Sequence, residues 1–370
     1  MTDEQPHGHS VYEPAEFLGA PASETIPESE VSLAQRFLNV RTIGSLVFAV
    51  LILFLFFKVV LDIDFGATID LIRSANPALL LAALVVYYLT FPIRGGRWWY
   101  ILRKVGTEVR YWMATEILFL SWFVNCLVPA KLGDLYRAFL LKGNIGASAS
   151  KTVGTIFVER IADIVVIFVL VLAAGFWSFR GRQRPELDFI FVAGFLVASA
   201  LLLLLLVLRF AGQHVERILP NRVEGFYARF REGSTAALTP RAIAVIGSAT
   251  IVIWLAEGLR VFFVLKALDL PDAQLGISAA IFVALVAALL TAIPLTPAGI
   301  GFVEAGIVGA LSLYGVSPES AVAIALTDRA ISILTVVVLG GIDYVRSPLV
   351  RRAHRAGLGN PPAPEALPGG

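Results

Sequence analysis

Long apolar runs occupy the central part of the chain. Between residues 42 and 345, stretches of mostly hydrophobic side chains alternate with short polar segments. A helix needs about 20 residues to cross the ~30 Å hydrocarbon core of a bilayer, and several of these runs reach that length. The pattern therefore predicts membrane helices, with candidates at 42–61, 77–93, 111–128, 152–176, 187–208, 242–268, 277–293, 299–315 and 321–345.

Charged residues beside these runs indicate which side of the membrane each end faces, because lysine and arginine are concentrated on the cytoplasmic side. The basic flanks are 94–110, 209–241 and 346–355, and the acidic flanks are 62–76 and 269–276. Segment 130–151 is also basic, although only the short run 111–128 separates it from 94–110. Since both flanks favour the cytoplasm, we expect 111–140 to form a re-entrant hairpin that enters and leaves on the inner side.

The second half of the chain raises the same conflict around 277–315. The acidic flank before it is assigned outside, and the last run must end inside at a basic segment, so a second hairpin enters from the outer side. Loop 178–188 carries three arginines against two acids and is nevertheless placed outside. The expected fold is an all-α polytopic membrane protein with about six full transmembrane helices and two re-entrant helical hairpins, both termini being cytoplasmic. Irregular backbone at this depth is tolerated where protein buries it or where it lines a cavity.

The two expected hairpin tips carry similar motifs. Residues 129–133 read Pro-Ala-Lys-Leu-Gly, and residues 297–301 read Pro-Ala-Gly-Ile-Gly. An acid–arginine pair follows each motif inside an apolar run, Glu159-Arg160 in the first case and Asp328-Arg329 in the second. The arginine lies 31 residues after the first proline of the first motif and 32 residues after that of the second.

A third landmark precedes each motif. Arg94 lies 35 residues before the first proline and Arg260 lies 37 residues before the second. Three landmarks in the same order predict an internal repeat covering about 77–176 and 242–345. Because the first unit starts outside and the second inside, the repeats are inverted, an arrangement that in transporters places the substrate site at the repeat interface.

Composition narrows the class of protein. Hydrophobic residues make up 57% of the chain and charged residues 16%, against about 45–50% and 25% in soluble domains. The net charge of +2 is too small to indicate nucleic-acid binding. A single cysteine and four scattered histidines predict neither a disulfide nor a metal site. The proline-rich, polar segment 1–41 and the end of 346–370 are expected to be disordered tails that flank the membrane domain 42–345.

Ionisable residues inside the apolar runs are the main chemical signal. Each costs at least ~2.5–3.5 kcal/mol at the bilayer centre and commonly marks a substrate pathway. Arg160 with Asp163, and Glu257 with Arg260, are spaced i,i+3 and can pair on one helix face, so structural ion pairs are the alternative interpretation. The candidate substrate-binding or translocation residues are Lys131, Asp134, Arg137, Glu159, Arg160, Asp163, Glu257, Arg260, Glu304, Asp328 and Arg329.

Proline and glycine at the hairpin tips predict helix ends whose free N–H groups attract anions. Thr296 is expected to cap a helix whose first residue is Pro297, the alternative being a bend that only fills space. The predicted tip residues are Pro129, Gly133, Pro294, Thr296, Pro297, Gly299 and Gly301. The aromatic triplet 98–100 is interpreted as part of an interfacial belt.

Arginine suits phosphate because its planar fork binds two oxygens at once. We assign Arg137, Arg160, Arg260 and Arg329 to phosphate binding, and Asp134, Glu159, Asp163, Glu304 and Asp328 to charge balance or proton coupling. Neither a phosphate-binding GxxxxGK(S/T) loop nor a G-x-S-x-G nucleophile motif occurs. No cofactor and no enzymatic activity are therefore expected.

Three segments resemble the lysylphosphatidylglycerol synthase transmembrane region, a flippase-like family. They are 127–137 (LVPAKLGDLYR), 158–163 (VERIAD) and 293–304 (IPLTPAGIGFVE), and the resemblance covers about 40–345. The family usually has Gly-Glu at the first tip, where this chain has Gly133-Asp134. We expect no counterpart of the soluble aminoacyl-transfer domain that the bifunctional members have. The resemblance thus implies lipid translocation without lipid lysylation.

Three hypotheses follow. The first is an inner-membrane translocase for an anionic or phosphate-bearing lipid. The second is a membrane-embedded transferase acting on a lipid-linked phosphate or sugar. The third is a non-transporting partner of a separate lipid-modifying or cell-envelope enzyme. The lipid, the direction of transport, the energy source and the oligomeric state are open at this stage.

Overall fold

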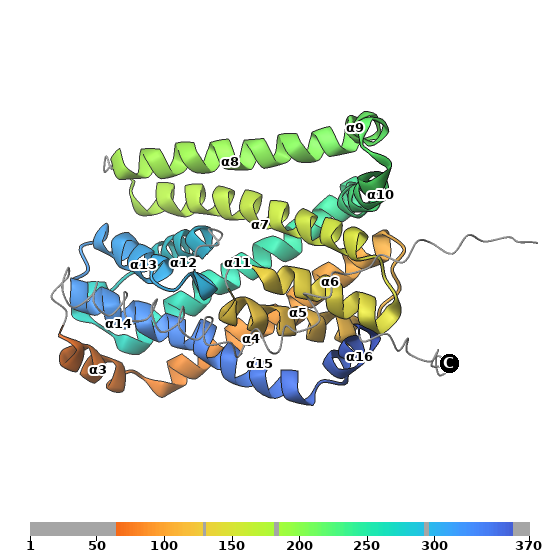
Figure 1. The fold of residues 1–370 in the computed structure, drawn as a ribbon. Helices are drawn as coiled ribbons and strands as arrows, with labels where there is room; N and C mark the ends of the chain where they lie inside the picture. Colours follow the sequence, from red (N-terminus) through yellow and green to blue (C-terminus); the bar gives the residue numbers. More distant parts are fainter. Residues whose placement is uncertain (1–63, 129–130, 181–184, 292–295, 358–370) are drawn as a thin grey trace, which may run out of the picture.

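The structure is a computed structural model that describes residues 64–128, 131–180, 185–291 and 296–357 (Figure 1). The expected tail 1–41, the candidate span 42–61, and the tip residues Pro129 and Pro294 lie outside the described residues. Within them, all regular structure is helical, which confirms an all-α polytopic membrane protein. The number of full spans and the inverted repeat stay predictions.

The α-helices are α3 (Phe65–Arg73), α4 (Pro77–Lys104), α5 (Tyr111–Leu127), α6 (Leu132–Ile145), α7 (Ala149–Ser178), α8 (Pro185–Phe210), α9 (Gly212–Ile218), α10 (Asn221–Thr235), α11 (Pro240–Leu268), α12 (Ile277–Thr291), α13 (Phe302–Ser312), α14 (Pro318–Arg329), α15 (Thr335–Arg346) and α16 (Pro348–Gly357). Two short 3₁₀ helices, η3 (Pro271–Ala273) and η4 (Pro297–Gly299), lie in the connections. A π-helical segment, η5 (Ala330–Leu334), joins α14 to α15.

Three helical runs among the described residues are long and apolar enough to cross a membrane. They are α4, α11 and the continuous run Pro318–Arg346. The long helices lie side by side, with α3 at one end of the molecule and α9, α10 and α16 at the other (Figure 1). Helices α5 and α6 pack against each other in the half that contains α16, and α12 packs on α13 in the half that contains α3 (Figure 1). The membrane sides from which the two hairpins enter stay a prediction.

The three membrane-length runs begin with the same local device. A polar residue accepts hydrogen bonds from the first free N–H groups, and proline occupies the first helical position, where no donor is needed. Asn76 Oδ1 accepts from Ala78 N at 2.9 Å before Pro77. Thr239 and Ser317 form the corresponding caps before prolines 240 and 318. These starts lie within three residues of the predicted 77, 242 and 321.

The end of the first described long helix differs from the prediction. Helix α4 continues to Lys104, whereas the apolar pattern ended the span at 93. Arg94 and Arg97 are therefore not cytoplasmic flank residues but are buried inside the molecule, 2% and 4% exposed. Trp98 is fully buried and donates from Nε1 to Thr155 Oγ1 at 3.1 Å, so its assignment to an interfacial belt was wrong.

The second hairpin tip also differs in detail. Thr296 precedes the short 3₁₀ helix η4, but its hydroxyl donates to the carbonyl of Ile300 at 2.8 Å and makes no cap. The α-helix α13 begins later, after Gly301, whose φ of 94° favours glycine. The amide of Gly301 donates to Glu304 Oε2 at 2.7 Å. Thr296 and Pro297 thus occupy the predicted N-cap and first helical positions, but of a short 3₁₀ helix and without the predicted side-chain cap, and the α-helix starts one turn later.

Candidate functional site

A cavity of about 180 Å³ lies in the interior, between the two hairpins and the long helices. The residues that line it come from the first half of the chain, in α5, Lys131 before α6, α7 and Tyr87 of α4, and from the second half, in α11, α12, the η4–α13 segment and α14–η5. The charged residues in the wall are Lys131, Arg160, Asp163, Glu257, Arg260, Asp328 and Arg329. The structure therefore brings together seven of the predicted path residues from widely separated parts of the sequence.

Six buried or half-buried side chains form a closed ring of alternating arginines and carboxylates on α4, α6 and α7. Its members are Arg97, Glu159, Arg137, Asp134, Arg160 and Asp163, in that order around the ring. The shortest contacts are Arg137 Nη1 to Glu159 Oε2 at 2.5 Å and Arg97 Nη1 to Asp163 Oδ1 at 2.6 Å. We call this set the arginine–carboxylate ring. Its three positive and three negative charges cancel.

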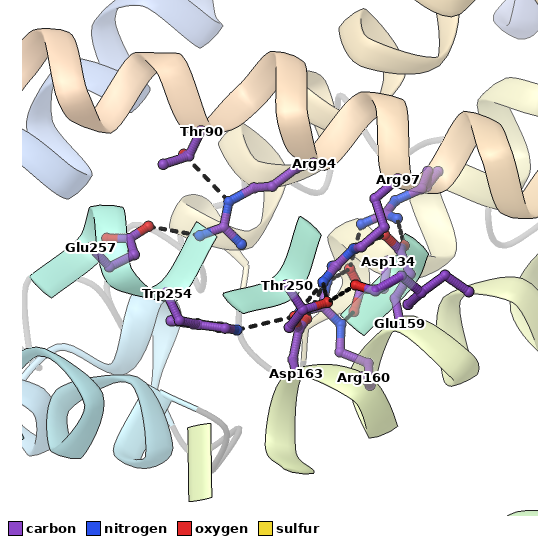
Figure 2. Close-up of polar contacts among 12 residues, drawn as sticks. Thr90, Arg94, Arg97, Asp134, Glu159, Arg160, Asp163, Thr250, Trp254 and Glu257 are labelled. Carbon is purple, nitrogen blue, oxygen red and sulfur yellow. Dashed lines mark hydrogen bonds and ion pairs between the residues drawn. The ribbon is translucent and has the colours of Figure 1, made fainter. Parts of the chain in front are cut away.

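The ring contains contacts within one helix and contacts between different helices. The expected i,i+3 contact between Arg160 and Asp163 is present at 3.5 Å. Asp134 at the start of α6 receives a two-pronged contact from Arg160, at 3.1 and 3.2 Å. Asp163 also accepts from Trp254 Nε1 at 3.2 Å, and Figure 2 shows this side chain reaching across from α11.

A second set of buried charges lies on α4, α11 and α14. Arg94 Nη2 contacts Glu257 Oε1 at 2.7 Å, and Glu257 Oε2 contacts Arg260 Nη1 at 2.6 Å, which is the other expected i,i+3 pair. Arg260 then binds both oxygens of Asp328, at 2.9 and 3.1 Å. We call this series, from Arg94 to Asp328, the second network.

Beside it, Arg329 forms a separate pair at the second hairpin tip. Its Nε contacts Glu304 Oε1 at 2.9 Å, and its Nη2 donates to the carbonyl of Ala298. Glu304 in turn accepts from the amide of Gly301, so this carboxylate ties the arginine to the start of α13. Counted together, the second network and this pair contain three arginines and three carboxylates, and their charges also cancel.

Aromatic rings cover several of the interior guanidinium groups. Arg94 lies 4.6 Å from the ring of Trp122 and 5.2 Å from that of Trp254. Arg260 lies 5.1 Å from Tyr87, and Arg137 lies 4.8 Å from Trp98. A planar guanidinium stacks on an aromatic face while its edge stays free for carboxylates, and lysine cannot do both. These positions therefore favour arginine over lysine.

The predicted residues divide into cavity wall and support. Four predicted residues lie behind the wall and not in it. Asp134, Arg137 and Glu159 belong to the arginine–carboxylate ring, and Glu304 binds the wall residue Arg329. Of the tip residues, Thr296 and Gly299 line the cavity, whereas Gly133, Pro297 and Gly301 do not. A Cβ on Gly133 would overlap Ser121 O and Asn125, so Gly133 lets α6 approach α5 closely.

Sequence reasoning missed several contributors. Arg94 and Arg97 were counted among the basic residues that indicate the cytoplasmic side. Their i,i+3 spacing directly after an apolar run is a signal that the helix continues and that both side chains share a face with the interior charges. Figure 2 shows both side chains pointing from α4 toward acids on α7 and α11. Thr250 accepts from Arg97 Nη1 at 2.7 Å, and no sequence signal singled it out.

Comparison with known proteins agrees with this architecture. Residues 42–340 match the family described as the lysylphosphatidylglycerol synthase transmembrane region. A UPF0104 membrane protein of Methanocaldococcus jannaschii is 34% identical over 223 residues, which are 60% of this chain and 93% of that protein. Glycosyltransferase AglD of Haloferax volcanii is 27% identical over 329 residues, covering 78% of this chain and 51% of AglD.

A UPF0104 membrane protein of Pyrococcus horikoshii is 22% identical over 305 residues, 76% of this chain and 90% of that protein. The family match covers most of the sequence, from the first candidate span to the last helix of the membrane region. The chain belongs to the lysylphosphatidylglycerol synthase transmembrane region family and is a multi-pass membrane protein.

Proposed function

We propose that this protein is a lipid translocase that moves an anionic or phosphate-bearing lipid headgroup across the cytoplasmic membrane. The headgroup would pass through the central cavity between two inverted halves, with both termini in the cytoplasm. The observation that carries the proposal is the charged wall of this cavity, which unites Lys131, Arg160, Arg260 and Arg329 with three carboxylates inside an apolar helical protein.

The energetic problem in lipid translocation is the headgroup charge. Moving a carboxylate- or ammonium-sized ion into a low-dielectric medium has an idealised cost on the order of 20 kcal/mol. Fixed ions and dipoles in a cavity lower this cost because they replace part of the lost hydration. The wall supplies both signs of charge, so either a phosphate or an accompanying cationic group finds a partner.

Support also comes from the placement of charge at both hairpin tips. Arg160 binds Asp134 at the first tip, and Arg329 binds Glu304 near the second. The contacts span 26 and 25 residues in sequence, which is the relation expected of equivalent positions in a repeat. A headgroup that exchanges with one of these carboxylates would loosen one tip, and so binding would be coupled to movement of a hairpin.

The test is lipid movement in vesicles that contain only the purified protein. Headgroup-labelled phosphatidylglycerol is incorporated, and a membrane-impermeant quencher reports how fast label moves between leaflets. We expect movement with the wild type and loss of movement with Arg160→Gln. The double variant Arg160→Gln/Asp134→Asn removes both charges of the pair, so that no charge is left alone, and should fold well and still not transport.

Arg73→Gln provides the matched control. Arg73 forms an exposed i,i+3 pair with Asp70 on α3, with 77% and 78% of the two side chains exposed, so its loss should leave movement unchanged. Wild-type rates in both Arg160 variants would reject the translocation path. Absence of movement in the wild type under every tested gradient would reject the function itself.

A membrane-embedded transferase is the second candidate, because one relative carries the name glycosyltransferase AglD. The chain corresponds to only about half of AglD in length, so the shared region and the activity in that name can belong to different parts of AglD. Incubation of the purified protein with a polyprenyl-phosphate sugar and mass spectrometry of the lipids would separate the two functions. A new lipid species would favour the transferase, and unchanged lipid with leaflet movement would favour the translocase.

A further inference from the structure

Lys131 differs from every other cation of the cavity wall. It directly precedes α6, with a left-handed φ of 53°, and its side chain lines the cavity. Each arginine of the wall contacts at least one carboxylate. Among the residues that the structure describes, Lys131 has no carboxylate within 4 Å and no hydrogen-bonded side-chain partner. Asp134 and Asp163 attract its ammonium group only from beyond contact distance, so within that part of the chain it is the one cation of the wall that does not touch a carboxylate.

A count of the formal charges in the ring, the second network and the Arg329–Glu304 pair also leaves Lys131 as the unmatched cation. The arginines are Arg94, Arg97, Arg137, Arg160, Arg260 and Arg329, and the carboxylates are Asp134, Glu159, Asp163, Glu257, Glu304 and Asp328. Six positive and six negative charges cancel, and Lys131 adds one, so the set carries a net charge of +1. The cavity wall alone has four cations and three carboxylates, again +1.

We propose that Lys131 is the docking group for a ligand with a single negative charge, a phosphodiester headgroup in particular. The inference rests on the proposed translocase function and specifies the substrate class of the same cavity. One phosphodiester neutralises the site, whereas a dianionic phosphomonoester leaves it at −1 and a zwitterion leaves it at +1. An uncompensated charge in a water-poor interior is unfavourable, so the monoanion is preferred over both.

This assignment changes the role of the arginines. A guanidinium that already binds carboxylates, as Arg260 binds Glu257 and Asp328, has little capacity left for a phosphate. The lysine ammonium is compact and sits on a flexible stem with three donors, so it can follow a headgroup that moves. The arginines then shape and neutralise the cavity, and the lysine makes the first contact.

The apolar part of the cavity wall fits a lipid rather than a free phosphate ester. Ala284, Ala287 and Ala288 on α12 and Ile164 and Ile167 on α7 also line the cavity, so its wall has apolar surface beside the charged groups. Alanine side chains leave room for the glycerol and first methylene groups that continue from the phosphate. A soluble phosphodiester has no acyl chains to bury against this surface.

Binding is tested with the full-length protein in detergent micelles, by titration of lipid and detection of a fluorescent change or of the mass of the complex. The probes are phosphatidylglycerol as the monoanionic phosphodiester, phosphatidate at pH 8 as the phosphomonoester, phosphatidylcholine as the zwitterion, and glycerophosphoglycerol as a soluble phosphodiester. We expect the wild type to bind phosphatidylglycerol at least tenfold more tightly than each of the other three.

The variants are Lys131→Gln, Lys131→Arg and, as the control, Lys266→Gln. Lys266 lies in the last turn of α11 and pairs with Gln274 on the surface, away from the cavity. Lys131→Gln should weaken phosphatidylglycerol binding at least tenfold, and Lys131→Arg should restore most of it. Lys266→Gln should bind as the wild type does. Gel filtration and thermal unfolding establish that each variant is folded.

Equal affinity of wild type and Lys131→Gln for phosphatidylglycerol would overturn the inference. Equally tight binding of phosphatidylcholine would overturn the charge argument, and equally tight binding of glycerophosphoglycerol would assign the site to a soluble phosphodiester instead of a lipid. These measurements do not involve transport. A protein that binds phosphatidylglycerol through Lys131 but moves no lipid would therefore reject the translocase and leave the binding site intact.

Discussion

The contact between Arg260 on α11 and Asp328 on α14 allows a direct test of whether the interior charges are structural. Both side chains are buried, with 8% and 3% of their surfaces exposed, and two parallel contacts of 2.9 and 3.1 Å join them. Arg260 has a second carboxylate partner in Glu257, at 2.6 Å. Asp328 has no other ion-pair contact among the described residues, which makes the two partners unequal.

Because the two residues differ in their other partners, we expect their substitutions to lower the free energy of unfolding by different amounts. Arg260→Met leaves Asp328 as a buried charge without a partner, for which a loss of about 3–5 kcal/mol is expected. Asp328→Asn leaves Arg260 bound to Glu257, so only one charged hydrogen-bonding pair is lost, about 1–3 kcal/mol. The double variant Arg260→Met/Asp328→Asn contains no stranded carboxylate. It should be more stable than Arg260→Met alone, although it carries an additional substitution.

The free energy of unfolding is measured by titrating the protein from mild detergent micelles into a denaturing detergent and following helical circular dichroism. The decisive comparison is the order of the three variants. Equal losses for Arg260→Met and Asp328→Asn, or a double variant less stable than Arg260→Met, would refute the reasoning. Either result would mean that water or another cation reaches Asp328 once Arg260 is absent.

Three further changes test packing, ring geometry and a surface cap. Gly95→Ala should destabilise the protein by about 1–3 kcal/mol in the same titration, because a Cβ there would overlap Thr115 and separate α4 from α5. The control is Gly247→Ala, which should be neutral or stabilising because the space around Gly247 is open. Equal effects of the two variants would contradict this packing. Arg97→Lys should cost about 2 kcal/mol or more, since one ammonium cannot replace contacts to two carboxylates of the ring, and a change below about 0.5 kcal/mol would argue against the ring. Asp272 loses hydration by partial burial, but hydrogen bonds from the start of α14 outweigh this and lower its pKa from the usual 3.8. A carboxyl group whose pKa is lower in the folded state stabilises the fold at pH values above its unfolded pKa, and this stabilisation is lost as the pH falls through the folded pKa. The difference in thermal unfolding temperature between wild type and Asp272→Asn should therefore shrink below about pH 4. Parallel pH profiles of the two proteins would contradict the cap.

Helix starts could be predicted closely because they depend on neighbouring residues. An apolar run preceded by Asn76-Pro77, Thr239-Pro240 or Ser317-Pro318 has few alternatives, since the polar side chain and the proline both act within one turn. The end of α4 could not be predicted in this way. Hydropathy counts Arg94 and Arg97 as charges facing lipid, whereas their partners come from α7 and α11, more than 60 residues away in sequence.

The candidate residues were found more easily than their partners. Charged side chains inside apolar runs are costly, so the sequence alone singled out eleven residues that the structure places in the cavity wall or in the networks behind it. The i,i+3 pairs were also predictable from helix geometry. Which carboxylate closes a ring with which arginine depends on how α4, α6 and α7 cross, and periodicity contains no information about that.

The contacts between the charged sets would restrict helix movement in the translocation cycle that we propose. Among the described residues, three side-chain hydrogen bonds or ion pairs join α11 to α4 and α7: Trp254 with Asp163, Thr250 with Arg97, and Glu257 with Arg94. Helices α4 and α11 pack directly on each other and carry these contacts. Movement of α4 relative to α11, as the proposed cycle requires, would break these contacts and separate Arg94 from Glu257, while the ring, whose charges cancel, could move as a unit. In that proposed cycle, a headgroup docked at Lys131 would lie in the cavity whose wall includes residues of both charged sets, and we expect its charge to compensate the interior during the step in which α4 and α11 separate.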